Sequence, residues 1–264
     1  MAEATANVEG LIETPLRPWQ FRWLGGMVFK PRSTLTSIRA VDKSIWLLPL
    51  LLIVALLAVR VIVNAPLKIA AIDQQGLPTP DPNGPILSPE QQAQLQQALE
   101  ATKGPVFQYV FPIAGAVISA LLLWSITAAL LHLFSTLQGG RGTMTRALNL
   151  VAWASTPTLI HLLVQIGYVL IAGKLIVEPG LAGFVAQPPD GSVFAHALLS
   201  RIDLYLFWQI VLLLIGVRIF TNLNARKGFM AVLVTMIIVL ALRLLPELLG
   251  AQLNGLTVTS FPLF

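Results

Sequence analysis

Long apolar runs separated by short polar segments dominate the pattern of this sequence. A helix needs roughly 20 apolar residues to cross the ~30 Å hydrocarbon core of a bilayer. Because a helix satisfies all of its backbone hydrogen bonds internally, runs of this length favour membrane-spanning helices. The pattern therefore predicts an all-α polytopic membrane protein with five transmembrane helices. The expected spans are residues 44–64, 106–137, 147–172, 204–223 and 229–249.

The segment ahead of the first span mixes aromatic and cationic residues. After a flexible tail over residues 1–18, the stretch "WQFRWLGGMVFKPRSTLTSIRAVDK" covers residues 19–43. Such a composition is typical of an amphipathic helix in the headgroup layer, with rings toward the membrane and cations toward anionic lipid. We expect an interfacial helix that runs directly into the first span. The alternative is a flexible basic flank that only sets orientation.

The connection after the first span, residues 65–105, has two unlike halves. Its first half contains the Pro- and Gly-rich stretch "GLPTPDPNGP" and predicts irregular chain. Its second half predicts an outer amphipathic helix over residues 88–102, since Ser88 and Gln91 have the spacing of a capping box. A narrow apolar stripe suggests that this helix rests on the outer face of the bundle. Binding of a partner protein is the alternative.

Composition and charge sharpen this picture. Hydrophobic residues make up 56% of the 264 residues and charged residues 11%, too few to cover a soluble surface. The chain has no cysteine, which excludes disulfides and thiolate chemistry. Ten Lys and Arg fall on the N-terminal side of the predicted spans and four on the other. The N-terminus is therefore expected in the cytoplasm and the tail over residues 250–264 outside. The Leu- and Ala-rich composition favours a prokaryotic plasma membrane.

Motifs of intramembrane catalysis are missing from the sequence. It contains no His-Glu-x-x-His, no Gly-x-Ser-x-Gly and no pair of acidic residues within one span. Its three histidines are far apart and lack the spacing of metal ligands. We therefore expect no enzyme activity, no cofactor and no metal. The expected partners are the lipid bilayer and a membrane protein or a second copy of the chain, and no nucleic acid.

Ionisable residues within spans are functional candidates because burying them in a bilayer is costly. Arg60, Asp203, Arg243 and Glu247 all fall near the outer ends of predicted spans. They could form a polar cluster between helices of the outer leaflet. The alternative is that the arginines reach the interface along their apolar stems, with a local Arg243–Glu247 ion pair one helical turn apart.

A second candidate lies deeper in the third span. His161 and Gln165 are one helical turn apart and are predicted to form a polar pair near the bilayer midplane. Such a pair could line a cavity, or it could make hydrogen bonds between helices. The residues alone leave both uses open.

Three stretches resemble the Yip family, membrane proteins named for their interaction with Ypt/Rab GTPases. They are "VFKPRSTLTSI" ahead of the first span, "ALNLVAWASTPTLI" in the third span and "LIGVRIFTNLNARKGFMAVLV" around the last turn. The likeness extends roughly over residues 20–249. The family resemblance implies five spans, with the N-terminus inside and the C-terminus outside. It implies no catalytic residue.

Two functions remain at this stage. The leading interpretation is a non-enzymatic scaffold, accessory subunit or membrane organiser of the Yip type. The alternative is a small transporter or channel subunit with a polar site near His161, which would favour a broken helix at that depth. A continuous polar cavity that reaches His161 would favour transport, whereas tight packing would favour a scaffold.

Overall fold

The structure is a computed structural model and describes residues 20–41, 43–75, 88–177, 179–185 and 193–254. All regular secondary structure in these ranges is helical, with a π-helical turn η1 and a 3₁₀ turn η2. The elements are α1 (Arg22–Phe29), α2 (Pro31–Arg39), α3 (Leu47–Gln75), α4 (Pro89–Thr102), η1 (Val106–Val110), α5 (Phe111–Leu137), α6 (Met144–Ala154), α7 (Thr156–Ala172), η2 (Gly180–Phe184), α8 (Val193–Arg201), α9 (Leu204–Thr221) and α10 (Ala225–Asn254).

Five helical segments among the described residues are long and apolar enough to cross a membrane. The predicted all-α polytopic fold is therefore confirmed. These segments are Leu47–Gln74, Val106–Leu137, Met144–Ala172, Leu204–Thr221 and Ala225–Pro246.

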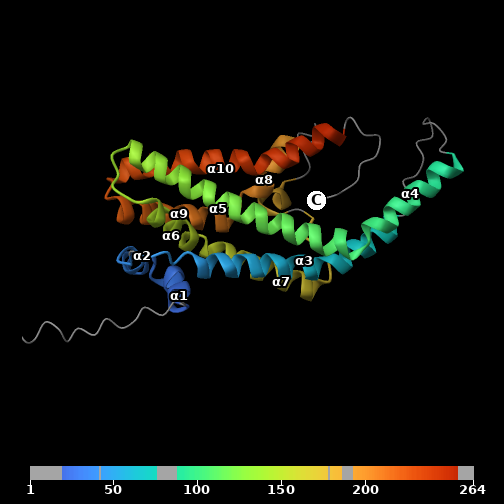
Figure 1. Cartoon of the computed structure of the whole chain (residues 1–264), viewed down its shortest axis with the longest axis horizontal. Helices are drawn as coiled ribbons and strands as arrows, with labels where there is room; N and C mark the ends of the chain where they lie inside the picture. The colour runs from blue at the N-terminus through green and yellow to red at the C-terminus, as the bar shows by residue number, and fades with distance from the viewer. Residues whose placement is uncertain (1–19, 42, 76–87, 178, 186–192, 255–264) are drawn as a thin grey trace, which may run out of the picture.

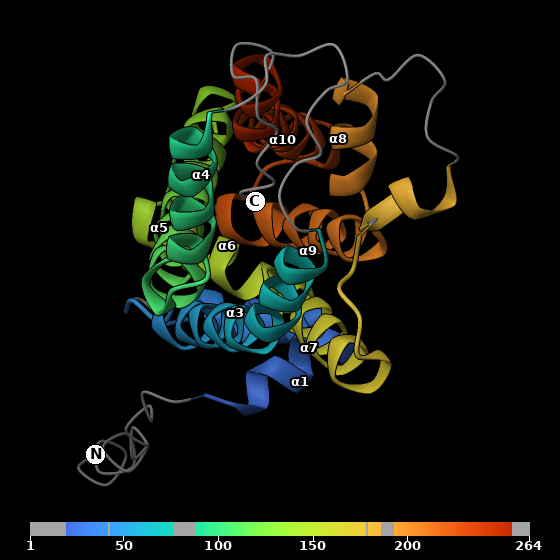
Figure 2. The same ribbon diagram turned by 90° about the vertical axis from the view of Figure 1, so that its right-hand side faces the viewer.

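The spans form one elongated bundle (Figure 1). Helix α3 packs on α5 and α7, α5 packs on α10 and α6, and α9 packs on α6, α7 and α10. Figure 2 looks along the bundle from the end at which α4 projects. We call this the α4 end, and we call the opposite end, where α1 and α2 lie, the N-terminal end.

The third span is divided into two helices. Helix α6 ends at Ala154 and α7 begins at Thr156, with Ser155 between them at φ −83° and ψ 6°. Pro157 has no N–H to continue the hydrogen bonds of α6, and the carbonyl of Trp153 accepts instead from the hydroxyl of Thr156 at 2.6 Å. The span therefore changes helix near its middle.

The N-terminal segment is helical, as predicted, but it forms two helices and not one. Lys30 leaves helical geometry at φ −139°, and Pro31 starts α2. Trp23, Met27 and Leu35 are buried in the core of the bundle. The expectation that the rings of this segment face the headgroup layer is wrong for Trp23, because protein contacts cover it. Trp19, also part of that expectation, lies outside the described residues.

The expected direct run from this segment into the first span is also wrong. Helix α2 ends at Arg39 and α3 begins at Leu47, and the described residues between them are not helical. Side chains of α6 donate to and accept from backbone groups of this connection. A tertiary contact therefore sets the path of the chain between α2 and α3.

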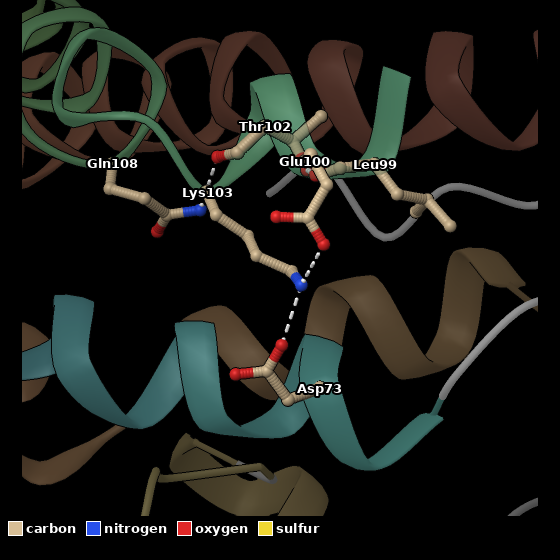
Figure 3. Close-up of polar contacts among 6 residues, drawn as sticks. All are labelled: Asp73, Leu99, Glu100, Thr102, Lys103 and Gln108. Carbon is tan, nitrogen blue, oxygen red and sulfur yellow. Dashed lines mark hydrogen bonds and ion pairs between the residues drawn. The ribbon is translucent and has the colours of Figure 1, made fainter. Parts of the chain in front are cut away.

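Helix α4 begins with the predicted capping box, in which Ser88 Oγ accepts from the backbone N–H of Gln91. The helix does not rest on the bundle as expected, because none of its residues is buried and it projects past the ends of α3 and α5 (Figure 1). Its base is attached by Lys103, whose Nζ lies 2.6 Å from both Asp73 Oδ1 and Glu100 Oε1 (Figure 3).

Candidate functional site

Two side chains of α6 hold the connection between α2 and α3, and we call them the α6 clamp: Asn149 and Trp153. Asn149 Nδ2 donates to the carbonyl of Lys43 at 2.9 Å, and Asn149 Oδ1 accepts from the N–H of Ile45 at 3.0 Å. Trp153 Nε1 donates to the carbonyl of Ile45 at 3.1 Å. Asn149 is 1% exposed, so both halves of its amide are used in the interior.

Aromatic rings surround the α6 clamp. The indole of Trp23 packs edge-to-face on Trp153 with 5.4 Å between ring centroids. The rings of Trp46 and Trp124 pack with 4.7 Å between their centroids, and Trp124 Nε1 donates to the carbonyl of Leu148 at 3.3 Å. Because indoles combine a large apolar area with one donor, this arrangement joins α1, α5, α6 and the connection before α3 with hydrogen bonds and apolar contacts.

Helices α1 and α2 together form what we call the platform, with its buried side against the bundle. Its outer side carries exposed cations at Arg22, Lys30 and Arg32. Phe29 is 83% exposed between them. Within α2, Ser33, Thr34, Thr36 and Ser37 donate hydroxyl hydrogen bonds to backbone carbonyls one turn earlier. The platform is a basic surface with one large exposed ring on an ordered base.

At the α4 end, His161 joins α7 to α9. Its Nδ1 lies 3.3 Å from Asp203 Oδ2, and its Nε2 lies 2.8 Å from Gln165 Nε2. The amide of Gln165 donates in the second contact, so the neutral ring accepts at Nε2 and carries its proton on Nδ1 toward Asp203. The ring also stacks on Tyr205, with 4.6 Å between centroids and 6° between planes.

Asp203 serves two partners at once. Its Oδ1 caps α9 by accepting from the N–H of Leu206 at 2.7 Å, and its Oδ2 faces His161. A carboxylate at the first turn of a helix is stabilised by the orphan N–H groups there. The site residues predicted in two groups therefore meet at Asp203, which contacts His161 directly.

Three arginines lie near Asp203 or near its partner His161. Arg60 interacts electrostatically with Arg201 and with His161, and Arg243 with Arg201 and Asp203. The Nε of Arg243 is buried and has no hydrogen-bond partner among the described residues. Glu247, predicted to pair with Arg243, lies on α10, but its side chain is outside the described part of the structure. Arg60 therefore lies near His161 and Arg243 near Asp203, with Arg201 close to both of these arginines.

The break in the third span has its own polar contact. Ser155 Oγ accepts from Gln209 Nε2 of α9 at 3.1 Å and donates to the carbonyl of Val151 at 2.8 Å. Gln165, 8% exposed, leaves its Oε1 without a partner. Polar side chains thus follow the α7–α9 interface from Ser155 toward Asp203.

Among the described residues, no group of three or more His, Asp or Glu has a geometry that could hold a metal ion. A comparison with protein families gives one decisive observation: the sequence model of the Yip1 domain matches residues 25–245, most of the chain. The chain belongs to the Yip1 domain family. The resemblance noted in the sequence is therefore confirmed, and the protein is an integral membrane protein of the Yip type.

The Yip1 domain match begins within α1 and ends within α10, so it includes most of the platform, the α6 clamp and the cluster around Asp203. Glu247 lies just beyond it. No curated protein and no solved structure matches this chain. The roles of individual residues in this Yip1 domain must therefore be argued from its own geometry.

Sequence reasoning missed several residues of these sites in the Yip1 domain. Asn149 is a polar residue in an apolar run of the third span, and that isolation was the available signal. Arg201 and Tyr205 flank Asp203 in sequence, but their relation to His161 depends on how α7 packs on α9. A sequence pattern reports neighbours along one helix and not neighbours across an interface.

Proposed function

We infer that this Yip1 domain protein is a non-catalytic membrane scaffold or accessory subunit that binds its partners through the platform. The observation that carries this inference is the integration of α1 and α2 into the bundle core through Trp23, Met27 and Leu35. A segment that only marked orientation would gain nothing from such burial. The buried side of the platform instead fixes the position of its outer side, on which Phe29 and several cations are exposed.

The charge of the platform suits an anionic surface. Each Lys or Arg near an anionic leaflet contributes about 1 kcal/mol of attraction, and an exposed ring adds apolar burial in the interface. The Lys and Arg distribution favours a cytoplasmic N-terminal end. In a prokaryotic plasma membrane, which the composition favours, the platform then meets the cytoplasmic leaflet. Anionic lipid and a protein partner can then bind this surface together, with the lipid in contact with the cations of the platform.

A second candidate, transport, is favoured by one observation: the third span is divided at Ser155, next to the contact with Gln209. Divided helices with polar side chains near the midplane are typical of transporter sites. Against this use, His161 is not among the residues that line the cavity of about 190 Å³ at the α4 end. Near the break, Gly216 approaches Leu150 so closely that an added Cβ would clash with it.

Photocrosslinking in native membranes tests the scaffold function. A photoreactive residue at Thr36, which is exposed on α2, should form one discrete crosslinked adduct with a partner protein. The double substitution Phe29→Ser and Arg32→Gln should abolish this adduct. The matched control is the same photoreactive residue at Phe184, which is exposed on η2 at the other end. Adducts that are equally frequent at both positions would contradict a docking role for the platform.

Purified protein in proteoliposomes tests the alternative. A scaffold should produce no solute flux above that of empty vesicles. Flux that disappears in His161→Ala, while the fold persists by circular dichroism, would replace the scaffold function with transport.

A further inference from the structure

A cavity of about 190 Å³ opens between α3 and the start of α5 at the α4 end. Its polar lining comes from Arg60, Asn64 and Lys68 of α3 and from Gln108 of η1, and its apolar wall includes Leu57 and Val61. None of the described residues that line it is acidic. This cavity is distinct from the contact between His161 and Asp203, and its use is independent of the scaffold function inferred above.

The three polar residues of α3 form a stripe. Arg60, Asn64 and Lys68 are spaced by four residues, so they lie above one another on one face of the helix. Neither Arg60 nor Lys68 makes a hydrogen bond or ion pair with a described residue. Arg60 instead lies within electrostatic range of a second cation, Arg201. The face thus presents two positive charges to a cavity without a counter-charge among the described residues.

The depth of the stripe matches the headgroup level of one leaflet. Measured from Leu47, the start of α3, Arg60, Asn64 and Lys68 lie about 20, 26 and 32 Å along the helix axis. A hydrocarbon core is about 30 Å thick, so Lys68 reaches the phosphate layer on the α4 side while Arg60 lies below it. Arg60 extends toward the interface along its stem, as long cationic side chains do.

The cavity also offers acceptors. Asn64 lines the cavity, and its buried Oδ1 has no hydrogen-bond partner among the described residues. Gln108 is held in place because its Nε2 donates to the carbonyl of Thr102 at 2.8 Å, which leaves its Oε1 as a second acceptor (Figure 3). A ligand that complements both features carries a negative group for the cations and hydroxyl donors for the amide oxygens.

We propose that this cavity binds the phosphate of an anionic phospholipid from the leaflet on the α4 side, with headgroup hydroxyls donating to Asn64 and Gln108. Arg60 and Lys68 contact the phosphate oxygens. The acyl chains leave along the apolar surface of the bundle, where Ile62 is exposed on α3 and Ile118 on α5. Phosphatidylglycerol combines the required charge and hydroxyls and is the probe of choice.

Native mass spectrometry of the full chain, with added phosphatidylglycerol, measures this binding. Arg60→Gln should weaken binding about tenfold, the size of a charge-assisted hydrogen bond to phosphate. Lys68→Gln should weaken it about fivefold, since this residue lies nearer water. The matched control is Lys174→Gln, an exposed cation that follows α7 at the same end and does not line the cavity.

The ligand chemistry is tested with three further probes. Phosphatidylcholine should bind at least tenfold more weakly than phosphatidylglycerol, because its headgroup has no net charge and no hydroxyl. Phosphatidylmethanol keeps the charge and lacks the hydroxyls, so Asn64→Leu should affect it less than phosphatidylglycerol. Soluble glycerol phosphate at millimolar concentration should not displace the lipid.

Three outcomes would overturn the proposal. The first is unchanged phosphatidylglycerol affinity in both Arg60→Gln and Lys68→Gln, and the second is an equal loss of affinity in Lys174→Gln. The third is displacement of the lipid by glycerol phosphate at equal affinity, which would make the ligand a soluble phosphate ester. Circular dichroism and the thermal midpoint of each variant, measured in the absence of lipid, show whether a loss of binding comes from unfolding.

Discussion

The two ends of the bundle use polar side chains in opposite ways. At the N-terminal end, Asn149 and Trp153 are buried and satisfy backbone groups of the chain between α2 and α3. At the α4 end, three buried atoms have no hydrogen-bond partner among the described residues: Asn64 Oδ1, Gln165 Oε1 and Arg243 Nε. The N-terminal end has one such atom among the described residues, Ser135 Oγ. Hydrogen bonding is thus nearly complete at one end and incomplete at the other.

This difference teaches where stability and function separate. A buried amide with both halves bonded specifies one conformation of the chain around it. A buried polar group without a partner costs free energy and is retained only where something else compensates for that cost. We therefore propose that the buried polar contacts at the N-terminal end hold the platform in a fixed shape for its partner, whereas the unpartnered groups at the α4 end bind a polar ligand.

The largest expected effect is that of removing the α6 clamp. Asn149→Ala leaves the N–H of Ile45 and the carbonyl of Lys43 unpartnered, so the free energy of unfolding should fall by about 2–4 kcal/mol. Thermal unfolding in detergent measures the change. The control is Asn224→Ala, which removes an exposed cap that accepts from the N–H of Lys227 and should cost about 1 kcal/mol. Equal losses in the two variants would remove the contrast between a buried clamp and a surface cap.

The α4 end should respond in the opposite direction. Arg243→Met keeps most of the side-chain volume and removes a charge whose Nε has no partner, so stability should be unchanged or rise by about 1 kcal/mol. The same unfolding assay compares it with Asn149→Ala. A loss of 2 kcal/mol or more would show that Arg243 is fully paired, with Asp203 as its partner, and that the two ends do not differ.

The smallest expected effect concerns the attachment of α4. Hydrogen bonds that the Lys103 ammonium donates to Asp73 and then to Glu100 raise the pKa of Lys103 above its ordinary value of 10.5. A raised pKa means that this attachment is complete below the ordinary value and is lost as the pH rises through the folded value. Lys103→Met should therefore speed amide hydrogen exchange in the last turn of α4 at neutral pH and leave α2 unchanged. Equal acceleration in α2 would show that the attachment is not local.

Local physics made part of this protein predictable from its sequence. Apolar runs long enough to cross a bilayer identified the spans, because the hydrophobic requirement depends on one segment at a time. The capping box at Ser88 was predictable since both partners lie within four residues. His161 and Gln165 share a helix face for the same reason, and their 2.8 Å contact follows from spacing along one turn.

Tertiary structure decided the rest, because the deciding partners are far apart in sequence. The aromatic N-terminal segment fits a lipid interface by composition, but Trp23 packs on Trp153 and is buried by protein. The chain does not continue as one helix from α2 into α3. Asn149, about a hundred residues later, supplies the hydrogen bonds for backbone groups that this non-helical connection does not pair within itself. Asp203 was named beside Arg243 from topology, whereas packing of α7 on α9 brings it to His161. The local sequence permits several conformations equally well. Burial of apolar surface between distant helices stabilises one of them over the others.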